Sequence, residues 1–286
     1  RGLAPARWIA DEEEHVYGLS QYPNSYKYPM KSLKLDENLA KFFGFYVAEG
    51  SFDGSSISLA LFDLELEQIV TDLLKSINPN FTTIIRRDKK GKRRDLRCRV
   101  GRTFASFVAD VCGRGAQNKR VPSEIFFSSP DIIKSFLDGY ISGDGTVAKN
   151  RVLASTVSQE LRDGIYLLMV RCGLPVSIDQ ETPVSQFANA RERFKIAVGG
   201  YYATSLSVSG RKEENLADLY QVTTEQTKYD YEYLRPLIAE VYGIKCRNAY
   251  QYRIRPLYIE ELIFDLEYRI LKPEEKKHIE QLASKE

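Results

Sequence analysis

Two stretches of the chain are apolar on nearly every side, and they dominate the pattern of hydrophobic and polar positions. One lies between Asp36 and Gly50, and the other lies between Ser129 and Gly145. An apolar run of helix length without a polar face is typical of a buried helix. Asp36 is a favourable N-cap, and Ser129 followed by Pro130 is a typical helix start. The pattern therefore predicts two buried helices.

The same order of elements follows each predicted helix. Short segments with β-branched residues predict strands, and Asp63 and Ser158 are N-caps for second helices whose apolar residues have helical spacing. A hairpin and a third short helix come next in each copy. The predicted unit is α-β-β-α-β-β-α, with strands at 55–59 and 151–156 and hairpins at about 81–100 and 176–198.

The two units match each other at a constant offset of 95 residues, which relates Glu49 to Asp144 and Asp63 to Ser158. The register continues without a gap over about thirty residues. A chance match would not extend so far, so we interpret the chain as two copies of one structural unit.

The repeats divide the chain into four parts. We expect an N-terminal extension at residues 1–32, the first repeat at 33–125 and the second at 126–220. Residues 221–286 read as helix, two short strands and helix, which predicts a small C-terminal α/β extension. The expected fold class is α+β, with two pseudo-symmetric αββαββα domains.

Composition narrows the chemistry that is available to the protein. The chain has 286 residues, of which 43% are hydrophobic, and no apolar run approaches the roughly 20 residues of a membrane span. Its four cysteines form no CxxC pair, and its two histidines lie near opposite ends. This argues against a zinc site, a disulfide framework and a histidine-dependent hydrolase. Chemistry should rest on carboxylates, lysines and arginines.

The segments 46–50 and 142–145, Tyr-Val-Ala-Glu-Gly and Ser-Gly-Asp-Gly, resemble the paired LAGLIDADG motifs of homing endonucleases. The resemblance covers about residues 33–215, and the stretch leading into the first motif is similar to archaeal-type intein endonuclease domains. It implies a site-specific enzyme whose saddle-shaped sheets grip DNA while two acids cut across the minor groove. It also implies short 3′ overhangs.

Small residues lie four apart in both predicted helices, at Gly44 and Ala48 and at Gly139 and Gly143. Each helix therefore carries a small-residue stripe on one face. Glycine within a helix costs about 0.5–1 kcal/mol relative to alanine, so close packing of the two helices must offset that cost. Parallel packing about a pseudo-twofold axis would bring the two helix ends together.

Glu49 and Asp144 would then emerge side by side. Two adjacent carboxylates at the negative ends of helix dipoles repel each other unless a cation lies between them. Oxygen ligands without nearby His or Cys indicate Mg²⁺, for which Mn²⁺ can substitute. The resemblance implies that the backbone carbonyls of Ala48 and Gly143 complete the metal ligands.

Phosphate cleavage also calls for positive charge, because its transition state accumulates negative charge. Members of the resembled family often carry a catalytic lysine in a Lys-x-x-Pro block, and Lys119 is the match here. Aligning the glycines that precede it in the two repeats makes Lys212 the nearest counterpart, with a shorter loop.

A strongly basic run extends from Arg86 to Arg99, with nine basic and two acidic residues and a net charge of +7 around a Lys-Gly turn. A two-stranded ribbon fits the DNA major groove, and Lys and Arg on it neutralise phosphates. The counterpart hairpin is less basic, which suits an asymmetric site. The predicted DNA contacts are Ser51, Asp53, Ser55, Arg86, Arg87, Lys89, Lys90, Lys92, Arg93, Arg94, Arg97, Arg99, Lys149, Arg151, Arg191, Arg193 and Lys195.

The prediction is a monomeric, Mg²⁺-dependent, cytoplasmic endonuclease that binds a long asymmetric site on double-stranded DNA. An intein-borne domain and a free-standing intron-encoded enzyme both stay open as its context. An RNA maturase or a non-cleaving DNA-binding protein of the same fold are the alternatives. Both motif acids are present, which favours the nuclease.

Overall fold

The computed structural model describes residues 15–24, 27–61, 63–148, 151–181, 192–199, 202–203, 206–210 and 212–216. All of them belong to one compact unit, residues 5–219. The elements predicted in residues 221–286 lie outside this part of the chain, as does Cys246. Among the described helices, none has the length and apolar character needed to cross a membrane.

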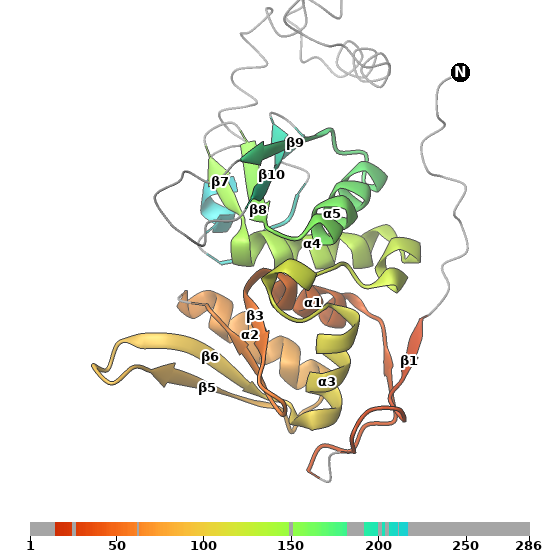
Figure 1. Ribbon diagram of the computed structural model, residues 1–286, viewed down its shortest axis with the longest axis vertical. Helices are drawn as coiled ribbons and strands as arrows, with labels where there is room; N and C mark the ends of the chain where they lie inside the picture. The colour runs from red at the N-terminus through yellow and green to blue at the C-terminus, as the bar shows by residue number, and fades with distance from the viewer. Residues whose placement is uncertain are drawn as a thin grey trace, which may run out of the picture. The chain divides into compact units, whose positions relative to one another are not determined.

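The first repeat has the predicted order of elements. Its four strands form an antiparallel sheet in the order β3-β4-β6-β5, so the second hairpin pairs with the first through β4 and β6. Figure 1 shows α2 and α3 beside this sheet. The elements are α1 (Glu37–Glu49), β3 (Gly50–Phe52), β4 (Ile57–Leu59), α2 (Leu64–Ile77), β5 (Thr82–Arg87), β6 (Arg93–Arg99) and α3 (Gly101–Val111).

The second repeat has the same topology, which confirms the duplication. Its antiparallel sheet has the order β7-β8-β10-β9, and each strand occupies the place of its counterpart in the first repeat. A helical segment at 212–216 ends the described part. The elements are α4 (Pro130–Asp144), β7 (Thr146–Ala148), β8 (Arg151–Thr156), α5 (Gln159–Arg171), β9 (Val176–Glu181) and β10 (Arg193–Gly199). The mixed α and antiparallel β fold is as predicted.

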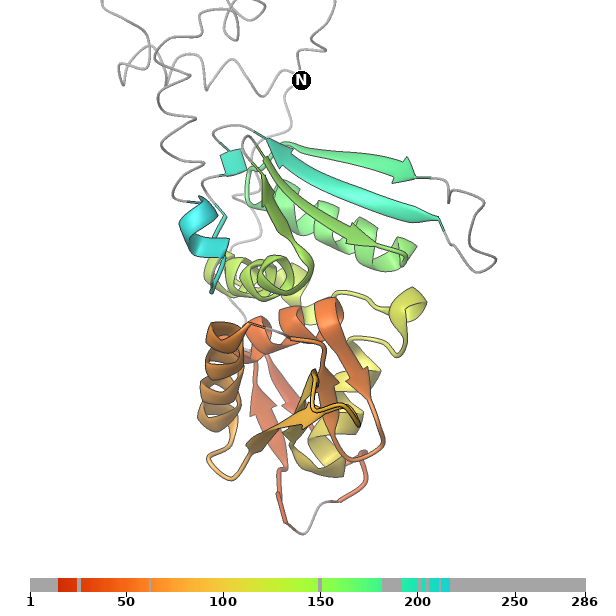
Figure 2. The same cartoon turned by 90° about the vertical axis from the view of Figure 1, so that its left-hand side faces the viewer.

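Helices α1 and α4 pack directly against each other, as Figures 1 and 2 both show. A Cβ atom added to Gly44 would lie 2.2 Å from the Phe136 carbonyl oxygen, and one added to Gly139 would lie 2.1 Å from the Lys41 carbonyl oxygen. Backbone therefore meets backbone at the crossing. The small-residue stripes predicted from the sequence form this contact, and the packing offsets the helical cost of glycine.

The helix starts are also as predicted. The Asp36 carboxylate accepts a hydrogen bond from the Leu39 amide at 2.8 Å, and Ser129 caps α4. At the other ends, Gly50 and Gly145 have negative φ values of −85° and −78°. Their need for glycine is steric, because an added Cβ at either position would lie within 2.5 Å of a carbonyl oxygen in the preceding turn.

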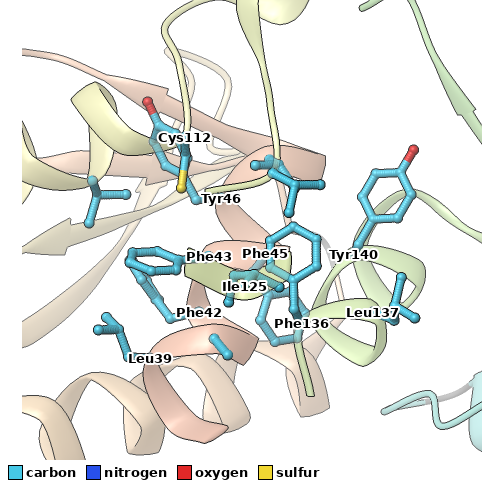
Figure 3. Close-up of a cluster of buried hydrophobic side chains, with 14 of the residues drawn as sticks. Leu39, Phe42, Phe43, Phe45, Tyr46, Cys112, Ile125, Phe136, Leu137 and Tyr140 are labelled. Carbon is cyan, nitrogen blue, oxygen red and sulfur yellow. The ribbon is translucent and has the colours of Figure 1, made fainter. Parts of the chain in front are cut away.

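Aromatic side chains from both helices fill the core around this crossing (Figure 3). Tyr46 and Tyr140 are fully buried. Phe136 from α4 lies near Phe45 from α1 in the same cluster. The core thus joins the two repeats and fixes the pair of helices whose ends carry the predicted acids.

The segment before the first repeat contains a hairpin that the sequence pattern did not predict. Strand β1 (Val16–Gly18) pairs antiparallel with β2 (Ser32–Lys34). Leu19 is 1% exposed, and the Tyr17 ring lies 4.8 Å from the Phe107 ring of α3 in an edge-on arrangement. This hairpin is therefore part of the core of the first repeat.

Candidate active site

The two predicted acids lie at the adjacent ends of the paired helices. Glu49 is the last residue of α1, and Asp144 is the last residue of α4. A Cβ added to Gly143 would lie 2.6 Å from the Ala48 Cβ and 3.4 Å from the Glu49 Cγ. Both acids line one cavity of about 530 Å³. The structure therefore brings together the residues that the 95-residue repeat singled out.

The surroundings of both carboxyl groups disfavour their charged forms. Burial raises the pKa of Glu49, with Lys212 acting in the opposite direction. Burial in the cavity wall and the nearby Glu49 raise the pKa of Asp144 to about 7, and Lys212 and Arg193 partly oppose the rise. Asp144 keeps substantial contact with solvent, so water screens part of this repulsion.

A divalent cation suits this pair of acids. Glu49 raises the proton affinity of Asp144, and a cation between two such carboxylates stabilises both as anions. Carboxylate and carbonyl oxygens are the donors that Mg²⁺ and Mn²⁺ accept. The described residues contain no group of three or more His, Cys, Asp or Glu side chains that could hold a metal ion. A metal here would need backbone carbonyls, water or substrate oxygens as further ligands.

Lys119 lies in the same cavity at the end of α1. Its side chain is 4% exposed, and its Nζ donates a 2.7 Å hydrogen bond to the Tyr46 carbonyl oxygen. The same nitrogen lies 3.2 Å from the centroid of the Tyr46 ring. Burial lowers the pKa of Lys119 to about 7, and the nearby Cys112 acts in the opposite direction. This ammonium group can exchange a proton near neutral pH.

Lys212 occupies the corresponding position at the end of α4. Its Nζ donates to the carbonyl oxygens of Ile141, Ser142 and Gly143 at 3.1, 2.7 and 2.9 Å. A cation at this end of a helix meets the negative end of the helix dipole. The Gly143 carbonyl predicted as a metal ligand thus already accepts one hydrogen bond, and its second lone pair is what a metal would use.

The two lysines follow the pseudo-symmetry of the repeats. Lys119 contacts the carbonyl of Tyr46 and Lys212 contacts that of Ile141, and these two carbonyls are 95 residues apart like the acids themselves. Their surroundings differ, because Lys119 is buried and Lys212 is only half-buried. The pair therefore matches in position and differs in environment.

Two arginines of the basic hairpin form ion pairs, one within the hairpin and one with the turn between β3 and β4. Arg86 donates to the buried Asp95 through Nε at 2.6 Å and also pairs with it through Nη2. Arg97 pairs with Asp53 at 2.7 Å and donates to Ser56. These contacts hold both guanidinium groups on the sheet face opposite the buried Leu96 and Cys98. Asp95 is already included in the net charge of +7, so only the pairing of Arg97 with Asp53, which lies outside the hairpin, lowers the net charge further, to +6.

The other predicted DNA contacts of this repeat are exposed. Gly91 adopts a φ of +77° in the turn, as the predicted Lys-Gly turn requires. The side chains of Arg93 and Arg94 lie outside the described part of the structure, as do the residues Lys149 and Arg191. The exposed residues are Ser51, Ser55, Arg87, Lys89, Lys90, Lys92 and Arg99.

The second sheet is close to neutral. Lys195 pairs with Glu181, and Asp179 lies opposite Lys195 in the strand register. Arg151 is exposed at the start of β8. Arg193 was predicted as a DNA contact on the second hairpin. It lines the cavity and lowers the pKa of Asp144, so it lies close to the acids. The predicted asymmetry between the two hairpins is present.

Sequence reasoning missed several polar residues around the cavity. Ser155 and Thr156 from β8 line it, and Ser158 hydrogen-bonds to the main chain of Lys119. Ser158 was recognised only as a helix cap. The signal that could have identified it is the difference between the two repeats, because the first copy has Asp63 at the matched position. A hydroxyl can donate a hydrogen bond, whereas a carboxylate cannot.

Comparisons with known proteins agree with this architecture. Residues 131–196 match a family model described as a LAGLIDADG-like domain, which confirms the resemblance seen in the motifs. A DNA polymerase of Thermococcus hydrothermalis is 33% identical over 151 residues, which are 50% of this chain and 9% of the polymerase. An A-type ATP synthase protein of Pyrococcus abyssi is 25% identical over 142 residues, 49% of this chain and 14% of that protein. The chain therefore spans only a small part of these relatives.

Two solved structures are similar at low sequence identity. The homing endonuclease I-DmoI, in a complex with DNA and Mn, is 12% identical, covers 58% of this chain and 90% of its own, and gives a TM-score of 0.42. The full-length DUF199/WhiA protein from Thermatoga maritima is 17% identical, covers 73% of this chain and 67% of its own, and gives a TM-score of 0.46.

Proposed function

We propose that this chain, which contains a LAGLIDADG-like domain at residues 131–196, is a site-specific double-strand DNA endonuclease. It acts as a monomer on a long asymmetric site, hydrolyses one phosphodiester bond in each strand with Mg²⁺ and leaves short 3′ overhangs. The observation that supports this most is the pairing of Glu49 and Asp144 at matched helix ends on one cavity. The monomeric state and the short 3′ overhangs are proposed from the resemblance of the two motifs to homing endonucleases, and the asymmetric site from the unequal charge of the two hairpins.

Glu49 and Asp144 would hold the divalent metal together with the carbonyls of Ala48 and Gly143. When bound, the metal activates a water as nucleophile and stabilises the leaving oxygen. The hydrolysis forms a bond between a water oxygen and phosphorus and breaks the bond from phosphorus to the leaving oxygen. The attacking water loses a proton, and the leaving oxygen gains one. Both transfers require groups that exchange protons near neutral pH.

Lys119 fits this requirement in its own half of the site. Its pKa of about 7 lets Nζ hold or release a proton at neutral pH. Lys212 and Arg193 add positive charge beside Asp144, where the transition state accumulates negative charge. The two halves of the site thus offer similar groups in different surroundings.

The exposed face of β5 and β6 supplies the main DNA contact in this proposal. Lys89, Lys90 and Lys92 surround the turn, and Arg99 lies exposed near the base of the hairpin. Arg86 and Arg97, held by Asp95 and Asp53, are pre-organised for contact at fixed positions rather than free to move. Such a ribbon fits the major groove.

An intein is the context that the relatives favour. A DNA polymerase and an ATP synthase protein have unrelated functions, and each matches this chain over only a small part of its length. Matches of this kind to proteins of unrelated function are what an element inserted into different hosts would give. The chain is accordingly proposed as the endonuclease region of an intein.

The test begins with purified protein, Mg²⁺ and a plasmid library that carries randomised inserts, from which linearised molecules are sequenced to define the target. Glu49→Gln and Asp144→Asn should bind that target without cutting both strands. Glu37→Gln, at the exposed start of the same helix as Glu49, is the matched control and should cut normally. Full cleavage by both motif variants would refute the metal-site assignment, and binding without any cleavage by wild type would favour a non-cleaving DNA-binding protein.

A further inference from the structure

We propose that two hydrogen-bond networks crossing between the repeats are positioning devices, one for each lysine of the active site. Ser158 of the second repeat fixes the main chain of Lys119. A cluster of Asp138, Ser142 and Ser209, joined by Lys41 of the first repeat, fixes the segment that carries Lys212. The inference rests on the proposed function, because it assigns each network to the cleavage of one DNA strand.

Ser158 joins the Lys119 loop to the second repeat. It is fully buried, and its Oγ donates a 2.6 Å hydrogen bond to the Lys119 carbonyl oxygen. The same Oγ accepts from the Leu161 amide at 3.1 Å and so caps α5. One hydroxyl therefore ties the peptide of Lys119 to the start of a helix in the other repeat. Ser158 does not line the cavity, so its effect on chemistry must pass through Lys119.

The Lys119 loop is also held by the first repeat, because the Tyr46 hydroxyl of α1 donates to the Gly113 carbonyl oxygen at 3.1 Å and the Lys119 Nζ donates to the Tyr46 carbonyl oxygen. It leaves α3 through Gly113, whose φ is +83° and whose added Cβ would lie 1.7 Å from the Asn118 carbonyl oxygen. The Arg120 amide donates back to the Cys112 carbonyl oxygen at 2.9 Å. These contacts close the loop on itself. The loop also packs against the second repeat through Val121, which lies beside Gly164 of α5. The bond from Ser158 is the one of these two contacts that acts on the Lys119 peptide itself.

The second network is charged. The Lys41 Nζ from α1 donates to Asp138 at 2.7 Å and to Ser209 Oγ at 2.8 Å. Ser142 Oγ donates to Asp138 at 2.8 Å and accepts from the Ser209 amide at 2.7 Å. Asp138, Ser142 and Ser209 are each less than 10% exposed. The cluster thus fixes both the side chain and the backbone of Ser209.

Ser209 lies three residues before Lys212. Gly210, with a φ of +71°, turns the chain between them, and its carbonyl accepts the Glu213 amide at 2.9 Å at the start of the helical segment. An added Cβ on Gly210 would lie 2.8 Å from Leu66 Cδ2 of the first repeat. The segment that carries Lys212 is therefore held against the first repeat, as the Lys119 loop is held against the second.

The two devices use different groups, so they can be disturbed separately. The hydroxyl of Ser158 stands where the first repeat has Asp63, whose carboxylate caps α2 by accepting the Glu65 amide at 2.9 Å. A carboxylate cannot donate the bond that Ser158 donates. Removal of either device should therefore misplace one lysine and leave the other in register.

The experiment measures cleavage of each strand separately, on a target duplex labelled at one end of either strand. Ser158→Gly should slow one strand by roughly 10- to 100-fold, the range expected when a catalytic group is displaced by about 1 Å, and change the other by less than about 2-fold. Ser209→Ala should slow the opposite strand preferentially. Ser158→Thr and Ser209→Thr keep the hydroxyl groups and should restore the balance between strands.

Ser129→Ala, which removes a helix cap that touches neither lysine segment, is the matched control and should leave the strand ratio unchanged. If Ser158→Gly does not fold, Ser158→Cys keeps its volume with a weaker hydrogen bond and should shift the ratio in the same direction. Equal slowing of both strands, slowing of the same strand by both variants, or unchanged ratios would overturn the inference while leaving cleavage by wild type intact. Wild-type protein that cuts nothing would refute the proposed function and this inference together.

Discussion

Replacing Gly139 with alanine tests whether the contact between α1 and α4 is as close as the structure shows. The new Cβ would lie 2.1 Å from the Lys41 carbonyl oxygen and 3.0 Å from the Phe45 amide nitrogen. Ordinary contact begins at 3.4 Å, so the helices would have to separate by about 1.3 Å at this point. Both obstacles are backbone atoms, which cannot move aside as a side chain can.

The magnitude follows from two opposing terms. Overpacking of this kind costs about 1–3 kcal/mol or more, and alanine regains about 1 kcal/mol of helix propensity over glycine. The net loss should be up to about 2 kcal/mol, which lowers the melting temperature by up to roughly 8 °C in a domain of this size. The separated helix ends would also move Glu49 away from Asp144, so cleavage should fall more than the folded fraction does.

Urea unfolding and thermal melting followed by circular dichroism measure the first effect, and strand cleavage measures the second. Gly164→Ala in α5 is the matched control, because its nearest obstacle is a methyl group of Val121 at 2.7 Å that can adjust. Its loss of stability should be less than half that of Gly139→Ala. A Gly139→Ala protein at least as stable as wild type would refute the reasoning.

Two further predictions concern charge. In metal-free buffer with a chelator, folding of the wild-type protein should weaken as pH rises from about 4 through 7, because the pKa of Asp144 is raised to about 7 in the folded state and the unfolded chain gives up that proton near pH 4. Asp144→Asn should therefore melt at a higher temperature than wild type above pH 7 and converge with it near pH 4; a variant that melts lower at pH 8 would contradict this. On a long duplex, Lys92→Gln and Arg99→Gln should each reduce the slope of log affinity against log salt by about 0.9, measured by fluorescence anisotropy, whereas the exposed Lys75→Gln on α2 should not change it. Equal slopes for all three variants would move the DNA contact away from β5 and β6.

The sequence predicted those features that depend on local pattern. The caps at Asp36 and Ser129, the order of elements in both repeats and the stripe at Gly44 and Gly139 follow from helix-start chemistry, from periodicity and from the cost of glycine in a helix. Local pattern alone does not predict contacts between distant residues. The offset of 95 residues did so here, because it paired Glu49 with a partner far along the chain.

Contacts between distant residues were beyond this reasoning. Strand β1 pairs with β2 across a segment without hydrophobic period, and a strand of three residues leaves too little pattern to detect. The ion pair of Arg86 with Asp95 was not predicted, because a count of charges says nothing of which charged groups meet. Ser158 and Lys119 are 39 residues apart, and no local rule links a helix cap to a carbonyl in another repeat.

The contact of backbone with backbone at Gly44 and Gly139 has an evolutionary consequence. Main-chain atoms set the distance between α1 and α4 there, so changes in the size of neighbouring core side chains alter that distance little. The spacing of the two acids is thereby insulated from drift in the rest of the core. Substitutions in the aromatic core or in the two hairpins that leave these two glycines in place should therefore preserve the spacing at which the acids meet.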